Sequence, residues 1–168
     1  MLKLYNTLSK GLEQVNPIEP GLVKMYTCGP TVYRDAHIGN LRSYLMADWV
    51  RRSLEVQGLS VTHVKNITDV GHMRQEMLER GEDKVVASAI AEGKSPREIA
   101  EFYTRCFLRD EKKLNIIPAS YFPRATDHVG EVLEILESLI GKGYAYEVQG
   151  NVYFQVSSFP SYGRLSGN

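Results

Sequence analysis

Two short β-prone runs separated by one amphipathic helix are the pattern that most limits the folds open to this chain. Residues 23–28 are apolar or β-branched except for Lys24, and they end at Gly29-Pro30, a pair that breaks a strand. From about Leu41 apolar residues recur every three or four positions until Gln57, which predicts a helix. Residues 59–68 are rich in Val, Thr and Ile and predict a second strand. Strand, helix and strand predict one βαβ unit with parallel strands and a right-handed crossover.

The rest of the chain predicts further helices and one hairpin. Ser95 and Glu98 form a capping box, with Pro96 at the first helical position. The expected elements are helices over residues 82–92, from Pro96 to about Leu114 and over 129–140, followed by a β-hairpin over 144–156. Prolines at positions 118 and 123 punctuate an extended linker. We therefore expect a domain boundary there, with residues 1–118 in one part and residues 119–168 in another.

Charge and composition limit the partners and the location. Twenty Lys and Arg against twenty Asp and Glu give a formal net charge of zero, so no overall basic field predicts nucleic-acid binding. No stretch offers the roughly 18 consecutive apolar residues of a membrane helix, and the first residues show no export signal. We expect a cytosolic protein without a membrane partner. A disulfide framework is not expected there, so Cys28 and Cys106 need separate explanations.

The loop from Cys28 to Asn40 carries the most chemical information. It joins the first predicted strand to the helix, so it lies at the carboxyl end of the parallel strands, where open α/β sheets bind ligands. The helix N-terminus begins near Asn40, and its free N–H groups and positive dipole end favour a phosphate. Gly39 would allow a nucleotide to approach the backbone closely, and His37 could donate a hydrogen bond to a phosphoryl oxygen.

These motifs resemble the cysteinyl-tRNA synthetase family of class I aminoacyl-tRNA synthetases. The run Cys28-Gly29-Pro30-Thr31-Val32-Tyr33 and the later His37-Ile38-Gly39 are similar to that family's signature and to its His-Ile-Gly-His motif. Further similarity is found over residues 4–8, 66–69, 123–126 and 162–166. Because these matches are separated and occur in the right order, the resemblance covers the whole chain.

The resemblance implies a fold and a division into domains. The expected fold class is α/β, with a Rossmann-like parallel sheet. Residues 1–118 would form the amino-terminal half of the nucleotide-binding catalytic domain. Residues 119–168 would begin an inserted α+β connective domain, made of a helix and a β-hairpin.

The resemblance also implies an activity, which is ATP-dependent formation of cysteinyl adenylate followed by transfer of cysteine to tRNA(Cys). Cys28 would supply one thiolate ligand to a zinc ion that binds the sulfur of substrate cysteine, and ATP would enter with magnesium. A thiophilic metal discriminates against serine where a hydrophobic pocket cannot. The implied substrate-binding residues are Cys28, Gly29, Thr31 and Thr68. The implied ATP-binding residues are Pro30, Thr31, His37, Ile38, Gly39 and Asn40, with His37 and Asn40 as the catalytic residues.

The chain departs from the family pattern in two ways. Asn40 stands where the motif has its second histidine, which keeps a hydrogen-bond donor but loses a positive charge. The family's other zinc ligands, its Lys-Met-Ser-Lys-Ser loop and its anticodon-binding domain would all come after Asn168. We therefore expect the chain to be nearly inactive alone and to self-associate through its uncovered sheet edge, whereas the complete enzyme would be monomeric.

Two other functions remain open. A sister ligase of the mycothiol pathway would keep the adenylation chemistry but pass cysteine to an amino-sugar, and a truncated module would have no catalytic role. Among single residues, Cys106 lies four positions after Phe102 on an apolar helix face and is expected in the core. Arg51 and Arg52 are expected on a solvated helix face. The hairpin tyrosines between Tyr144 and Tyr153 are expected to serve packing more than base stacking.

Overall fold

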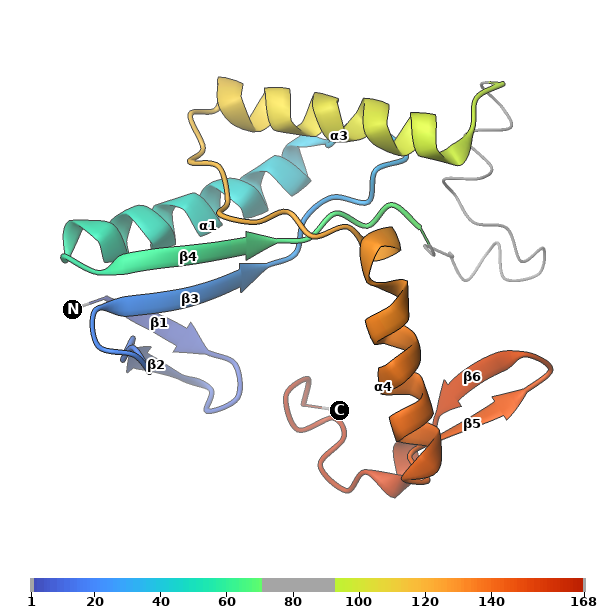
Figure 1. The fold of residues 1–168 in the computed structure, drawn as a ribbon. Helices are drawn as coiled ribbons and strands as arrows, with labels where there is room; N and C mark the ends of the chain where they lie inside the picture. The colour runs from blue at the N-terminus through green and yellow to red at the C-terminus, as the bar shows by residue number, and fades with distance from the viewer. Residues whose placement is uncertain (1, 71–92, 168) are drawn as a thin grey trace. The chain divides into compact units, whose positions relative to one another are not determined.

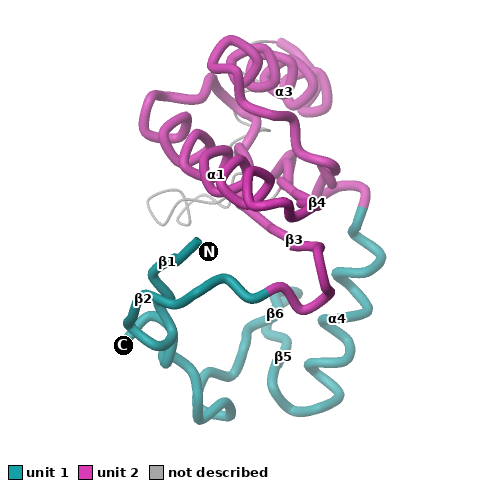
Figure 2. The backbone as a smooth tube through the Cα atoms, turned by 90° about the vertical axis from the view of Figure 1, so that its left-hand side faces the viewer, with its two compact units in different colours: residues 1–16, 128–168 teal, residues 17–127 magenta. Residues whose placement is uncertain are grey.

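The computed structural model describes residues 2–70 and 93–167 of the chain, which divide into two compact units (Figure 2). One unit comprises residues 17–127, and the other comprises residues 1–16 together with 128–168. The helix expected over residues 82–92 lies outside the described residues. No helix in the described ranges is long and apolar enough to cross a membrane.

The 17–127 unit is built on the predicted βαβ element. Strand β3 (Leu22–Thr27) leads to helix α1 (Ile38–Val56), which returns to strand β4 (Ser60–Lys65). The two strands are parallel, in a register that runs from Leu22 opposite Ser60 to Thr27 opposite Lys65. The parallel pairing predicted from the sequence is therefore confirmed. Helix α3 (Pro96–Lys113) follows, and its predicted capping box is present, with the Ser95 and Glu98 side chains each bonded to the other's backbone N–H.

An extended segment, residues 120–125, pairs in parallel with β4 and the residues that follow it, along the edge opposite β3. The N–H of Lys65 donates to the carbonyl of Tyr121 at 3.0 Å, and the N–H of Ile67 donates to the carbonyl of Pro123 at 2.8 Å. In return, Ala125 N–H donates to the carbonyl of Ile67 at 3.1 Å. The prolines expected to mark a linker thus lie in or beside an edge segment, where a missing N–H is tolerated.

The expected boundary after residue 118 does not coincide with the division between the compact units. The 17–127 unit continues to Asp127, because residues 120–125 are bonded to β4. Residues 1–16 also group with the C-terminal part of the chain. The assignment of residues 119–168 to an inserted connective domain stays a prediction.

The core of the 17–127 unit lies where α1 and α3 cover one face of the strand pair (Figure 1). Alternate residues of β4 and its continuation, His63, Lys65 and Ile67, are all buried, as the two-residue period of a strand requires. Two apolar clusters fill the layer. They consist of Val32, Ile67, Ile99 and Ala100 in one, and of Tyr44, Phe107 and Ile116 in the other.

A buried ion pair stands inside this apolar layer. The Lys65 ammonium of β4 pairs with the Glu111 carboxylate of α3, and both side chains are almost completely buried. The ammonium also lies 4.9 Å from the ring centroid of Tyr44 on α1. Burial raises the pKa of Glu111, and the neighbouring Lys65 opposes that rise. The pair links a strand to both helices that cover it.

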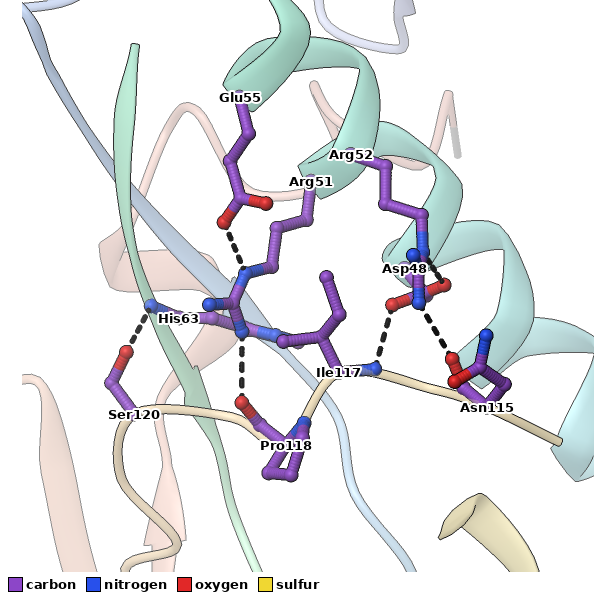
Figure 3. A network of polar contacts seen from close by, with 9 residues as sticks. All are labelled: Asp48, Arg51, Arg52, Glu55, His63, Asn115, Ile117, Pro118 and Ser120. Carbon is purple, nitrogen blue, oxygen red and sulfur yellow. Dashed lines mark hydrogen bonds and ion pairs between the residues drawn. The ribbon is translucent and has the colours of Figure 1, made fainter. Parts of the chain in front are cut away.

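A polar network attaches the end of α1 to the segment that follows α3 (Figure 3). The buried Asp48 carboxylate accepts hydrogen bonds from Arg52 Nε at 2.6 Å and from the N–H of Ile117 at 2.9 Å. Arg51 Nη1 donates to the carbonyl of Pro118 at 2.8 Å, and its side chain is only 14% exposed. The expectation of a solvated face was therefore wrong for Arg51. The Arg52 side chain is 40% exposed, as expected, although its Nη2 also donates to the carbonyl of Asn115 at 2.6 Å.

The other unit contains two antiparallel hairpins and one helix. Strands β1 (Lys3–Asn6) and β2 (Gly11–Gln14) form the first hairpin, which the sequence analysis did not predict. Helix α4 (Val129–Gly141) follows the short 3-10 turn η2 (Ala125–His128) and leads to strands β5 (Ala145–Val148) and β6 (Asn151–Phe154) and the turn η3 (Val156–Ser158). The β5–β6 hairpin agrees with the prediction, and Gln149 and Gly150 at its turn both have positive φ, at 52° and 79°. Tyr146 and Tyr153 stack across it, with ring centroids 5.8 Å apart.

Removing one partner of the buried pair should be far more damaging than removing both. Lys65→Met leaves the Glu111 carboxylate buried without its cation, and we expect a loss of about 3–5 kcal/mol in the free energy of unfolding. The double variant Lys65→Met/Glu111→Met should recover most of that loss. Urea unfolding of the wild-type chain, both single variants and the double variant measures the coupling. A double variant as unstable as the sum of the two singles would contradict this account.

The stability of the chain should fall as the pH drops below about 6.5, because His63 is buried. Burial first, and then the positive charges of Lys65 and Arg51, lower the pKa of His63 to about 4, with Asp48 opposing. Between pH 6.5 and pH 4 the unfolded chain therefore binds a proton that the folded chain excludes, so stability is lost as the pH falls. We expect this histidine to contribute on the order of 2–3 kcal/mol to that loss.

Urea unfolding as a function of pH tests this, with His63→Gln expected to flatten the profile between pH 6.5 and pH 4. The half-exposed His128, which pairs with Glu131, serves as the control: exposed pairs contribute little, so His128→Gln should change the profile far less than His63→Gln does. Equal profiles for wild type and His63→Gln would show that His63 does not carry the effect.

Candidate active site

The loop after β3 is held against the chain that follows β4. The N–H of Thr68 donates to the carbonyl of Pro30 at 3.0 Å, and the N–H of Val32 donates to the carbonyl of Thr68 at 3.1 Å. Thr31 and Thr68 are therefore partners in a parallel bridge beyond the ends of the strands. This pairing places two of the predicted substrate-binding residues side by side.

Asn66 connects the two sides of this arrangement. Its Oδ1 accepts hydrogen bonds from the N–H of Gly29 at 2.9 Å and from the Tyr26 hydroxyl at 3.0 Å. Its Nδ2 donates to Thr68 Oγ1 at 3.0 Å. Because Thr68 Oγ1 already accepts a hydrogen bond from Asn66, its own hydroxyl proton is directed elsewhere and can be donated to a ligand.

Gly29 is required by a close approach of two backbone segments. A Cβ at position 29 would overlap the carbonyl oxygen of Asn66 and lie 2.9 Å from its carbonyl carbon. Neither atom can move without displacing the backbone after β4. Only glycine lets the loop that carries Cys28 pass this close to the second strand's end.

His37 and Asn40 cap helix α1 reciprocally. His37 is the N-cap residue, and its Nδ1 accepts a hydrogen bond from Gly39 N–H at 3.0 Å. Asn40 Oδ1 in turn accepts from the N–H of His37 at 3.2 Å. The sequence analysis expected free N–H groups at this helix end, and that was wrong for Gly39, whose N–H the imidazole already satisfies.

The cap also determines what each side chain has left to offer. A neutral imidazole that accepts at Nδ1 carries its proton on Nε2, so His37 can donate from Nε2. Asn40 keeps its Nδ2 amide, which makes no hydrogen bond within the described residues. A Cβ at Gly39 would lie 2.9 Å from Cε1 of His37, so a side chain there would push the imidazole out of the cap. The requirement for glycine thus arises within the protein, and not only from an approaching nucleotide.

A cavity of about 220 Å³ lies beside the loop and the start of α1. It is lined by Gly29, Pro30, Thr31, Tyr33, Arg34, Asp35, Ala36, Asn40 and Tyr44. Four of the predicted site residues are in this set: Gly29, Pro30, Thr31 and Asn40. The others, Cys28, His37, Ile38, Gly39 and Thr68, lie next to these in sequence or in the sheet but do not line the cavity. Ile38 is 86% exposed and packs little against the protein.

The two cysteines occupy different environments. Cys28 is exposed directly after β3, whereas Cys106 is buried on α3 and does not line the cavity, as the sequence analysis expected. Burial raises the pKa of the Cys106 thiol; Arg109 opposes that rise and the Asp35 carboxylate adds to it.

Several residues of this site were not recognised from the sequence. Tyr44 was counted only as a helix-face residue, yet it lines the cavity; burial and then the negative charges of Glu111 and Cys28 raise its pKa to about 12. Arg34 and Asp35 lie in the loop between Cys28 and Asn40, but no role was predicted for them. Asn66 was noted only as part of a matching stretch. The sequence offered one indication of its role: Asn66 comes directly after a predicted strand and shortly before a hydroxyl residue, Thr68, and a carboxylate residue, Asp69.

Comparison with known proteins assigns the family. The model of the tRNA synthetases class I (C) catalytic domain matches residues 14–168. The chain belongs to this family of class I synthetase catalytic domains. It is 46% identical over 166 residues to the cysteine–tRNA ligase of Chlorobium luteolum, and 47% identical over 165 residues to that of Treponema denticola. These matches cover 99% and 98% of the chain but 34% and 33% of the two relatives, so the chain spans about a third of their length.

Solved class I synthetases share the fold. A methionyl-tRNA synthetase of Mycobacterium tuberculosis, solved with methionyl-adenylate, superposes with a TM-score of 0.62 at 22% identity, over 74% of this chain and 23% of that one. The LeuRS of Agrobacterium radiobacter, solved with tRNA and LeuAMS, gives a TM-score of 0.60 at 22% identity, over 78% of this chain and 16% of that one. The Rossmann-like class expected from the sequence is thus confirmed.

A methyl group at position 29 should disrupt the site and the fold together. We expect Gly29→Ala to lower the free energy of unfolding by more than about 2 kcal/mol, because a backbone carbonyl must move to admit the Cβ. Gly130→Ala in α4 is the matched control, since nothing lies within 4 Å of the added atom there. It should be neutral or slightly stabilising. Equal urea midpoints for Gly29→Ala and wild type would refute the close approach.

Proposed function

We propose that this chain forms the part of a cysteine–tRNA ligase that binds ATP and cysteine, in an enzyme that makes cysteinyl adenylate and then esterifies tRNA(Cys). The observation that carries the proposal is the cavity at the carboxyl ends of β3 and β4, bordered by a His37–Asn40 cap at the helix N-terminus. It occurs in a chain that is 43–47% identical, over nearly its whole length, to cysteine–tRNA ligases. Open α/β sheets bind their ligands at this edge.

The proposed work of His37 follows from its tautomer. With Nδ1 accepting from Gly39, the proton on Nε2 can be donated to a phosphoryl oxygen as negative charge develops on it. Asn40 lines the neighbouring cavity, and the N–H groups of its Nδ2 are left to donate. Both groups are oriented by the cap before any substrate binds, so little reorganisation is needed.

On the amino-acid side, Gly29 and Thr31 would frame the substrate cysteine, and Thr68 would donate its hydroxyl proton to it. Cys28 would be one ligand of a zinc ion, and its exposed soft sulfur at the strand end fits that role. Bound zinc would supply an anchor for the substrate's thiolate, which serine cannot match. Among the described residues, no group of three or more His, Cys, Asp or Glu could hold a metal, so Cys28 alone should not bind zinc tightly.

The isolated chain should therefore show almost no activity, and a chimaera should restore it. We expect cysteine-dependent ATP–pyrophosphate exchange by the 168-residue chain to be at least about 100-fold below that of the Treponema denticola enzyme. Replacing the matching third of that enzyme by residues 1–168 should give a ligase that charges tRNA(Cys). In the chimaera, His37→Ala should lower the exchange rate by about 100-fold. The exposed His128→Ala is the control and should have no effect.

Two results would contradict the proposal. Exchange by the isolated chain near the level of the complete enzyme would show that the chemistry needs fewer residues than proposed. An active chimaera that is indifferent to His37→Ala would remove the assigned role of the cap. Supplying an amino-sugar acceptor in place of tRNA tests the alternative ligase activity directly.

A further inference from the structure

The cavity needs a positive charge that the recognised motif does not supply. Asn40 is neutral, and its Oδ1 is already used in the cap. The imidazole of His37 blocks the N–H of Gly39, which would otherwise face an anion. The first turn of α1 carries no acidic residue, so its positive dipole end is not cancelled, but a helix end supplies only about half an elementary charge. Within the described part of the chain, the cationic side chain that lines this cavity is Arg34.

Arg34 is held at the cavity wall by an aromatic platform. Its guanidinium carbon lies 5.2 Å from the ring centroid of Tyr33, and Tyr33 packs against the Val32–Ile67–Ile99–Ala100 cluster. Stacking of this kind orients the plane of a guanidinium and leaves its edge N–H groups available for a bidentate acceptor. Over residues 2–70 and 93–167, Arg34 forms no ion pair. Within these ranges the guanidinium is therefore positioned at the cavity without a direct acidic partner.

The neighbouring Asp35 forms no ion pair with Arg34 within the described part of the chain. Asp35 also lines the cavity and weakens its positive potential, but its carboxylate interacts electrostatically with Cys106 and Arg109, both on α3. The cavity volume of about 220 Å³ is smaller than the roughly 300–1,000 Å³ of pockets that enclose a drug-sized ligand. It therefore suits the phosphate chain of a nucleotide better than the whole molecule.

We propose that Arg34 binds the phosphate groups of the nucleotide at this cavity and supplies the charge that Asn40 lacks. The inference rests on the proposed ATP site and adds a residue to it. Arginine is suited to this task, because its fork of N–H groups matches two phosphate oxygens at once.

Calorimetric titration of the 168-residue chain with Mg-ATP, AMP and adenosine tests the proposal. Wild type should bind Mg-ATP more tightly than adenosine. Arg34→Ala should weaken Mg-ATP binding by about tenfold and leave adenosine binding unchanged, whereas Arg34→Lys should recover part of the loss. Asp35→Asn should strengthen Mg-ATP binding a few-fold, because it removes a negative charge from the same wall. A general loss of structure would weaken Mg-ATP and adenosine binding equally. The ratio of the two affinities therefore distinguishes a lost charge from a lost fold.

The control variant is Arg97→Ala, whose exposed side chain lines a different cavity at the start of α3 and should not affect Mg-ATP binding. Equal Mg-ATP affinity for wild type and Arg34→Ala would overturn the role of Arg34 while leaving the ATP site in place. Failure of wild type to bind either Mg-ATP or adenosine would instead overturn the ATP site, and with it this inference. If Arg97→Ala lost Mg-ATP binding while Arg34→Ala kept it, the nucleotide would have to bind at the cavity beside α3 instead, and this inference would be wrong.

Discussion

The pairing of the chain after β3 with the chain after β4 is the constraint on which the site depends. Thr68 bonds to both Pro30 and Val32, so the parallel ladder continues past the last residues of the strands. Asn66 adds a side-chain clamp to Gly29, and the absent side chain at Gly29 lets the two backbones meet. Cys28, Thr31 and Thr68 owe their relative positions to these contacts. A small shift here would move every proposed cysteine contact together.

The layer beneath the site combines apolar packing with a few buried charges. Tyr44 belongs both to the apolar cluster with Phe107 and to the cavity wall, so the core and the site share a side chain. Lys65 and Glu111 fix the spacing of β4 and α3 around it. Such a pair costs desolvation energy and is weak evidence for stability. It joins β4 to α3 in the layer that also contains Tyr44.

The cap of α1 shows how one motif serves structure and chemistry. His37 and Asn40 satisfy the helix N-terminus through one atom each and keep one nitrogen each for a ligand. Gly39 is needed so that the imidazole can fold back over the first turn. Because these groups are occupied with the helix, a phosphate would find less positive potential here than a free helix end offers, and Arg34 becomes important for that reason.

The sequence by itself determined the elements whose signals are local. All of the following were predicted. The parallel strands and α1 follow from the spacing of apolar residues, the capping box from Ser95 and Glu98 three positions apart, and the β5–β6 turn from residues that accept positive φ. The family and its loop motif were likewise readable, because they are written in contiguous residues. The tertiary structure alone decided the pairing of residues 120–125 with β4, the burial of Arg51 against Pro118, and which site residues line the cavity. The first two features depend on groups far apart in the chain, as in the backbone bonds of residues 65–67 to residues 121–125 and the bond of Arg51 to Pro118, 67 positions away. Such contacts leave no periodic trace in a single sequence, because each joins individual groups whose distance is set only by the folded chain.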